Sequence, residues 1–189
     1  MSALTKKKKY TPEEYLALEE KAEFRSEFDN GEIVAMAGGS ITHIRITSNI
    51  SRTIGNRVTE NCESLATDMK VWVESVSKFY YPDVTVLCGK PNFYEKRNDT
   101  ITNPILIVEV LSDSTEAKDR GEKFFAYQTL TSLQEYVLVS QDKAVVEHFV
   151  RQNDGSWKYQ ATIGLKSTVK LESIEVELTL EEIYKRVEL

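Results

Sequence analysis

The length of 189 residues fits one domain that is large enough to bury a hydrophobic core. Hydrophobic residues make up 41% and charged residues 29% of the chain, which is typical of a soluble globular protein. No stretch approaches the ~20 apolar residues that a membrane helix needs. The formal net charge of −6 argues against a broad basic surface for nucleic acid, although a metal site itself concentrates carboxylates.

The chain begins with a basic segment, residues 1–10, which contains four consecutive lysines and no apolar core. This pattern predicts a mobile tail and excludes a secretory signal, so we expect a cytoplasmic protein with a single domain at 11–189. Cys62 and Cys88 show no C-x-x-C or Cys/His clustering. In a reducing cytoplasm they are expected to be two buried free thiols, and zinc is not expected.

The N-terminal elements follow from capping and turn residues. Thr11, followed by proline and then by Glu14, predicts a helix over roughly 12–21 with a capping box. Asn30-Gly31 predicts the tight turn of a hairpin over 27–34. After Ser40, isoleucine and valine recur at spacings near three and four, which predicts an amphipathic helix to about residue 61; these residues are Ile44, Ile46, Ile50, Ile54 and Val58.

The remaining chain alternates predicted strands with two helices. The clearest strand is 104–111, a continuous β-branched run of the kind found in a covered central sheet. A helix is expected from Ser112 to about Thr129. Further strands are expected at 65–73, 79–87, 135–140, 144–151 and 157–163, with a polar loop at 89–103 and a last helix at 179–187. The pattern predicts one mixed α/β domain.

Two carboxylates interrupt apolar strand patterns. Glu109 lies inside the run 105–111, and Asp83 follows Pro82 in the β-rich segment 80–86. An ionised carboxylate is costly to bury unless it is paired, hydrogen-bonded or bound to a cation. The separation allows the two acids to lie on neighbouring strands and to converge on one hard cation. The alternative for each acid alone is a strand end that faces water.

The ordered segments around these acids resemble the Uma2 family, a bacterial branch of the PD-(D/E)XK nuclease superfamily. They are 81–84 with its Pro82-Asp83 pair, 104–112, 119–123 and Tyr127, preceded by 25–27, 30–33 and 36–43. The resemblance runs from about Thr11 to about Val139. It implies a restriction-endonuclease-like fold, with a mixed central β-sheet flanked by helices, and here a β-rich C-terminal extension.

The resemblance also implies a divalent metal, Mg²⁺ or Mn²⁺, held by Asp83 and Glu109. The peptide carbonyl of Val110 would be a further ligand. Glu27 would be an additional ligand, directly or through water; its alternative is an exposed hairpin glutamate.

One position departs from the superfamily pattern. The lysine expected two residues after the second acid is replaced by Leu111. Lys123, on the following helix, is the natural substitute, with Asp119 one helical turn away at the i,i+4 spacing. The alternative is an ordinary ion pair between these two residues at the surface.

Asp119 and two further residues are expected to orient the substrate. His43, near the start of the long helix, could hold a phosphate or a water, and Tyr127 could donate a hydrogen bond to the site. Their alternatives are helix capping and core packing, respectively. His148, among apolar neighbours, is assigned to structure.

The expected function is a metal-dependent endonuclease that hydrolyses phosphodiester bonds in DNA. The sequence leaves RNA or another phosphodiester open as the substrate. The alternative is a nuclease-fold module for binding or assembly that has lost catalysis, which the replacement at Leu111 and the acidic net charge favour. A homodimer would place one site on each strand of a duplex. Aromatic residues of the C-terminal half would form its interface or complete the core; these are Tyr136, Phe149, Trp157 and Tyr159.

Overall fold

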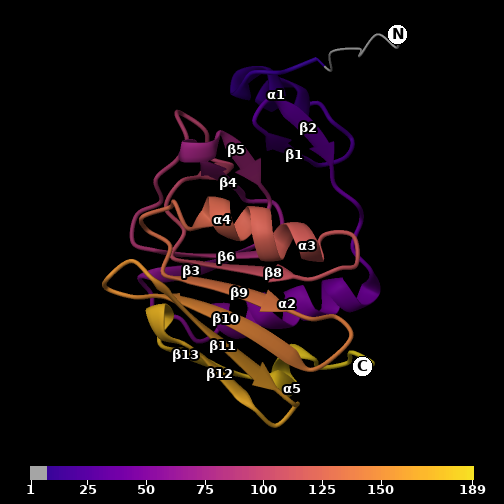
Figure 1. Ribbon diagram of the computed structural model, residues 1–189, viewed down its shortest axis with the longest axis vertical. Coiled ribbons are helices and arrows are strands. Elements are labelled where there is room, and N and C mark those ends of the chain that lie inside the picture. Colours follow the sequence, from indigo (N-terminus) through magenta and orange to yellow (C-terminus); the bar gives the residue numbers. More distant parts are fainter. Residues whose placement is uncertain (1–7) are drawn as a thin grey trace.

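The computed structural model describes residues 8–189, and within them a six-stranded mixed sheet forms the centre of the molecule (Figure 1). Its strand order is β11-β10-β9-β8-β6-β3, with β8 and β9 parallel and the other pairs antiparallel. The strands are β3 (Cys62–Ala66), β6 (Val84–Cys88), β8 (Leu106–Val110), β9 (Glu135–Val139), β10 (Val145–Arg151) and β11 (Trp157–Ile163).

A second sheet of the described residues has five strands in the order β2-β1-β5-β4-β7 and lies at the top of Figure 1 with the first helix. Asn30 and Gly31, both at positive φ, form the tight β1–β2 turn that the sequence predicts. The elements are α1 (Pro12–Glu19), β1 (Ser26–Asp29), β2 (Glu32–Ala35), β4 (Lys70–Val73), β5 (Lys78–Tyr80) and β7 (Thr100–Ile101).

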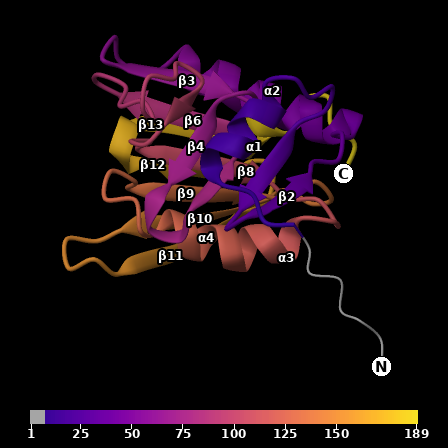
Figure 2. The same cartoon turned by 90° about the horizontal axis from the view of Figure 1, so that it is seen from above.

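Both faces of the central sheet are covered (Figures 1 and 2). One face packs against α2 (Ile41–Gly55), the hairpin of β12 (Thr168–Leu171) and β13 (Val176–Thr179), and α5 (Leu180–Ile183). The other face packs against the helical segment that follows β8 and against the five-stranded sheet. That segment consists of α3 (Glu116–Lys118), a π-helical turn (Asp119–Lys123) and α4 (Phe124–Tyr127). Short 3₁₀ turns occupy Glu74–Val76 and Glu172–Ile174.

Several predicted elements differ from the structure. The strands predicted at 65–73 and 79–87 each split, and their halves enter different sheets. Both capping boxes form, at Thr11 and Thr179, but their helices end at Glu19 and Ile183. The hairpin β12–β13 was not predicted. Ile44, assigned to the buried side of the long helix, is 52% exposed, whereas the other apolar residues of that series pack into the core.

The prediction of two free thiols is wrong. Cys62 and Cys88 are direct cross-strand partners on β3 and β6, and the structure joins them in a disulfide. Neighbouring strands bring opposed residues to within disulfide reach, a relationship that depends on register rather than on local sequence.

The aromatic residues of the C-terminal half mostly complete the core. Tyr136 is fully buried and stacks on Phe124, while Phe149 and Trp157 pack against the same ring. Tyr159 is 54% exposed.

Most of the predicted basic tail, residues 1–7, lies outside the described residues; in the described part, the amide of Tyr10 donates to the carbonyl of Gly31. Across residues 8–189, no helix combines the length and the apolar character that a membrane crossing needs.

Candidate active site

Asp83 lies where the chain passes from the five-stranded sheet into β6. Strand β5 ends at Tyr80, and Pro82 cannot donate a ladder hydrogen bond, so the strand pattern is interrupted immediately before Asp83. The Oδ2 atom of Asp83 accepts a hydrogen bond from the amide of Val110 on β8 at 2.7 Å. Its Oδ1 atom lies 2.7 Å from Nε2 of His43, near the start of α2. Asp83 therefore connects the central sheet to the N-terminal end of α2.

Glu109 is the next-to-last residue of β8 and is buried, with 3% of its surface exposed. Alternation along the strand turns its side chain toward the helical segment after β8, on the same face as Ile107 and Leu111. Its Oε1 atom accepts hydrogen bonds from Nζ of Lys123 and from the hydroxyl of Tyr127, both at 3.1 Å. The buried carboxylate is therefore paired and hydrogen-bonded, as its position requires.

Lys123 lies at the centre of a group of carboxylates. Its Nζ atom is 3.2 Å from Oε1 of Glu27 and 3.1 Å from Oδ1 of Asp119, in addition to its contact with Glu109. Lys118 contacts the other oxygen of Glu27 at 2.8 Å. Asp119 and Lys123 are 1% and 5% exposed, so the alternative of a surface ion pair is wrong.

The local backbone explains how Lys123 reaches Glu109. Asp119 and Lys123 are the first and last residues of a π-helical turn between α3 and α4. Such turns occur frequently at functional sites. Leu111, at the usual lysine position, packs in the apolar cluster with Ala126 and Tyr127 instead.

The pKa values of the buried groups follow from the position of the Lys123 ammonium among several carboxylates. Burial raises the pKa of Glu109 well above its ordinary value; Lys123 opposes this effect, and Asp119 and Asp83 add to it. Burial disfavours the charged form of Lys123, but Glu109, Glu27 and Asp119 outweigh it and raise the pKa of Lys123. Lys123 therefore stays protonated. Burial would raise the pKa of Glu27, yet its contacts with Lys123 and Lys118 lower it.

A cleft of about 590 Å³ opens over these groups. It is bounded by the segment after β2, the start of α2 and the turn after β8. The described residues that line it include six carboxylates but only two lysines; the carboxylates are Glu27, Asp83, Glu109, Asp113, Asp119 and Asp142. This excess of hard oxygen donors and negative charge suits a divalent cation.

The acids do not form a ready-made coordination shell in this conformation. Among residues 8–189, no three His, Cys, Asp or Glu side chains come together as a metal site. Both oxygens of Asp83 have partners in His43 and the Val110 amide. A cation that binds these acids would replace some of these contacts.

The structure thus brings the sequence-predicted residues to one cleft, in two groups of polar contacts: His43 and the Val110 amide contact Asp83, whereas Glu27, Glu109 and Asp119 contact Lys123 and Tyr127 donates to Glu109. The two groups meet where Glu109 and Val110 follow each other on β8. His148 is outside both groups, buried on β10 with Nε2 3.5 Å from Glu135, in agreement with its structural assignment.

Sequence reasoning missed Lys118 and Gln141. The Gln141 amide donates to the carbonyl of Leu111 at 2.6 Å and accepts from the hydroxyl of Ser40 at 2.8 Å. These two bonds hold together three segments that line the cleft. Lys118 directly precedes Asp119 in the sequence, but no local pattern predicts its contact with Glu27, which lies 91 positions earlier.

A family model described as "Putative restriction endonuclease", that of Uma2, matches residues 12–182. The chain belongs to the Uma2 family. Two uncharacterized proteins of Synechocystis sp. are similar to it, each with 36% identity: sll1609 over 88% of this chain and 94% of its own length, and slr1290 over 94% and 92%.

A solved structure supports the fold of this Uma2 protein. It is a crystal structure titled as a putative nuclease belonging to DUF820, from Anabaena variabilis, with a TM-score of 0.76 and 17% identity. The match covers 93% of this chain and 97% of the other. The restriction-endonuclease-like fold class predicted from the sequence is therefore confirmed.

Proposed function

We propose that this Uma2 protein is a metal-dependent endonuclease that hydrolyses phosphodiester bonds in DNA. The observation that carries the proposal is that Asp83, directly before β6, and Glu109, on the adjacent antiparallel strand β8, line one cleft in which Lys123 lies 3.1 Å from Glu109. The description of the family and that of the Anabaena structure support a nuclease, and the excess of carboxylates supports a cation requirement.

The proposed ligands of Mg²⁺ or Mn²⁺ are the carboxylates of Asp83 and Glu109 and the carbonyl of Val110, with Glu27 as an additional ligand. When bound, such a cation neutralises charge on a scissile phosphate and lowers the pKa of a coordinated water. The residues present fit it, because carboxylate and carbonyl oxygens are the donors that Mg²⁺ prefers.

Lys123 is proposed to stabilise charge that develops on the phosphate. Its ammonium is buried and held protonated by three carboxylates, so its position is set before the substrate arrives. Asp119 and Tyr127 are proposed as positioning residues: Asp119 contacts Lys123, and the hydroxyl of Tyr127 fixes one oxygen of Glu109. His43, held against Asp83 at the cleft, is proposed to donate to a phosphate oxygen.

Cleavage of supercoiled plasmid DNA tests the proposal. The purified protein is expected to nick or linearise the plasmid with Mg²⁺ or Mn²⁺ and not with EDTA. Asp83→Asn and Glu109→Gln are expected to reduce the rate by at least about 100-fold, the usual cost of losing one transition-state charge contact. Glu63→Gln, which removes an exposed carboxylate on β3 of the same sheet, is the matched control and should cleave normally.

The competing function is a nuclease-fold binding or assembly module without catalysis. One structural observation favours it: Lys123 and Tyr127 already occupy Oε1 of Glu109. Absence of both cleavage and calorimetric Mn²⁺ binding would support the module, whereas Mn²⁺ binding that is lost in Asp83→Asn would oppose it.

We also propose a homodimer, which would place one cleft on each strand of a duplex. Sedimentation at equilibrium measures this oligomeric state directly.

A further inference from the structure

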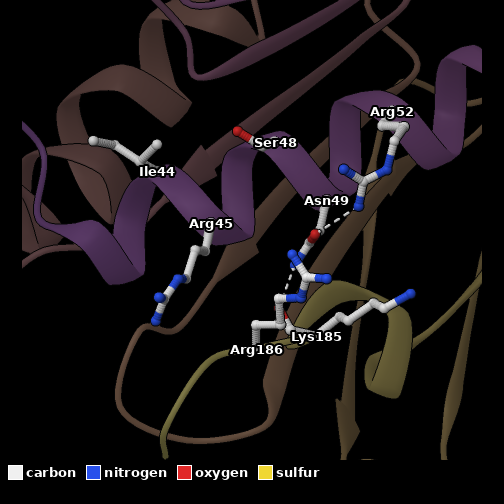
Figure 3. A pocket seen from close by; sticks show the side chains of 7 residues that line it. All are labelled: Ile44, Arg45, Ser48, Asn49, Arg52, Lys185 and Arg186. Carbon is white, nitrogen blue, oxygen red and sulfur yellow. Dashed lines mark hydrogen bonds between the residues drawn. The ribbon is translucent and has the colours of Figure 1, made fainter.

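A second hollow, of about 390 Å³, lies between α2 and the segment that follows α5, and its charge is opposite to that of the cleft (Figure 3). Its lining includes four cationic side chains and, among the described residues, no carboxylate. We call it the basic groove; it is lined by Ile44, Arg45, Ser48, Asn49, Arg52, Lys185 and Arg186. In a chain of net charge −6, such a gathering of positive charge is unexpected for a merely solvated surface.

The cations are exposed, and most are not neutralised. Arg45, Arg52, Lys185 and Arg186 are all solvent-exposed. Among residues 8–189, Arg45, Lys185 and Arg186 have no ion pair, and the guanidinium of Arg52 donates to the amide oxygen of Asn49 at 2.8 Å. The nearby carboxylate of Glu182 is engaged by Arg57 and by the cap of α5. The positive charge of the groove therefore faces solvent.

A buried side chain holds the two sides of the groove together. Asn49, 7% exposed, donates both amide hydrogens, to the carbonyls of Ile183 at 3.0 Å and Lys185 at 2.9 Å. Its oxygen meanwhile orients Arg52. Figure 3 shows Arg45 and Arg52 projecting from α2 toward the side where Lys185 and Arg186 lie. These hydrogen bonds hold the backbone of the C-terminal segment against α2, so that both sides of the groove keep their relative position.

The groove and the cleft lie against different faces of α2 and share no lining residue. His43 lines the cleft, and Ile44 and Arg45 line the groove. The nine-residue step from His43 to Arg52 covers about 13 Å of helix, the axial length of about four phosphates of one DNA strand. The start of α2, the C-terminal segment and the turn after β8 lie at the same edge of the molecule in Figures 1 and 2.

We infer that the basic groove binds the sugar–phosphate backbone of duplex DNA at the edge of the molecule that also holds the cleft. Arginine and lysine are the side chains that neutralise phosphates, and such contacts set register without reading sequence. The groove thereby supplies the attraction that the acidic cleft lacks. This inference rests on the proposed function in one respect: the duplex held in the groove is the one that is cut in the cleft.

The test measures binding of a fluorescein-labelled 20-base-pair duplex by anisotropy in EDTA, over about 50–200 mM KCl. The groove variant combines Arg45→Gln, Lys185→Gln and Arg186→Gln, and leaves Arg52 because it contacts Asn49. The charge-matched control combines Lys90→Gln, Lys96→Gln and Lys158→Gln, three exposed lysines of the loop after β6 and of β11. Thermal melting of both variants verifies that they fold.

The groove variant is expected to bind more weakly and with a slope of log K against log [salt] that is shallower by about two to three, because each lost phosphate contact removes about 0.9. The control should keep the slope of the unmodified protein. Equal slopes for the groove variant and the control would overturn the inference, as would absence of duplex binding by the unmodified protein at every salt concentration. Groove-dependent binding without cleavage in Mg²⁺ or Mn²⁺ would support the groove and reject the nuclease.

Discussion

The imidazole Nε2 of His43 and the carboxylate Oδ1 of Asp83 lie 2.7 Å apart across 40 positions of sequence. This contact joins the first turn of α2 to the beginning of β6, the two elements that flank the cleft. Burial alone would lower the pKa of His43, but the hydrogen bond and the negative charge of Asp83 outweigh it, so the pKa of His43 is raised above its ordinary value. The contact therefore favours the charged form of His43 in the cleft.

We predict that, in metal-free protein, an NMR titration gives His43 a pKa above about 6.5, the ordinary histidine value. A raised folded-state pKa stabilises the fold below the unfolded value, and this contribution is lost as the pH rises through the folded value. In Asp83→Asn the two contributions of the Asp83 carboxylate are lost, whereas burial and Lys123 still lower the pKa of His43 and Asp119 still raises it, so this pKa should fall relative to the unmodified protein. An identical titration in both proteins would contradict the contact. His148 serves as the internal reference, because Asp83 does not contact it.

Removal of Lys123 should destabilise the protein strongly. Lys123→Met leaves Glu27, Glu109 and Asp119 without their shared cation in a buried site. The loss of one partner from a buried ion pair costs about 3–5 kcal/mol of the free energy of unfolding. Urea unfolding at neutral pH measures it, with the exposed Lys96→Met as the control. A cost below about 1 kcal/mol would contradict the role of Lys123 as their shared buried cation.

A divalent cation should stabilise the folded protein. If Mn²⁺ binds in the cleft and not to the unfolded chain, its presence at 100 times Kd raises the free energy of unfolding by about 2.7 kcal/mol. Asp83→Asn should lose this gain, whereas Glu63→Gln should keep it, because Glu63 is exposed on β3 away from the cleft lining. A gain of the same size in Asp83→Asn would place the cation elsewhere.

Local sequence was sufficient for the features that depend on neighbouring residues. The capping boxes at Thr11 and Thr179 and the Asn30-Gly31 turn formed because a few adjacent side chains determine them. The two acids were recognisable because a carboxylate inside an apolar strand must find a partner. The apolar patterns of β8 and α2 were also predictable, because each pattern lies within a single segment of the chain.

Features that depend on register or on distant contacts were not predictable. The apolar pattern over 79–87 does not reveal that its halves pair in different sheets, a break that positions Asp83. The disulfide requires Cys62 and Cys88 to be opposed across β3 and β6. The basic groove requires Asn49 to bind a carbonyl 136 positions later. Such relationships are set by the whole fold, which one segment does not specify.

Loss of the disulfide should lower stability. The bond between Cys62 and Cys88 closes a loop with a sequence separation of 26 residues. Constraint of the unfolded chain by a loop of that size contributes about 3 kcal/mol. The double variant Cys62→Ser, Cys88→Ser should therefore unfold at lower urea concentration. Dithiothreitol should destabilise the unmodified protein to the same extent and leave the variant unchanged; equal stability of all samples would show that the thiols are not joined.

Glu135 should matter for stability and not for cleavage. Its fully buried carboxylate accepts hydrogen bonds from the amides of Glu172 and Ser173, at 2.6 and 3.2 Å, and from the Ser173 hydroxyl at 2.9 Å. It thereby holds the 3₁₀ turn before β13 against the central sheet.

Glu135→Ala would leave these donors unpaired, and each buried unpaired donor costs about 1–3 kcal/mol. We therefore expect the free energy of unfolding to fall by about 2–5 kcal/mol, as measured by urea unfolding. Glu135→Gln keeps an acceptor oxygen and should lose less. Because Glu135 does not line the cleft, plasmid cleavage by the folded variant below its melting temperature should match that of the unmodified protein. A large loss of cleavage with unchanged stability would instead assign Glu135 to the active site.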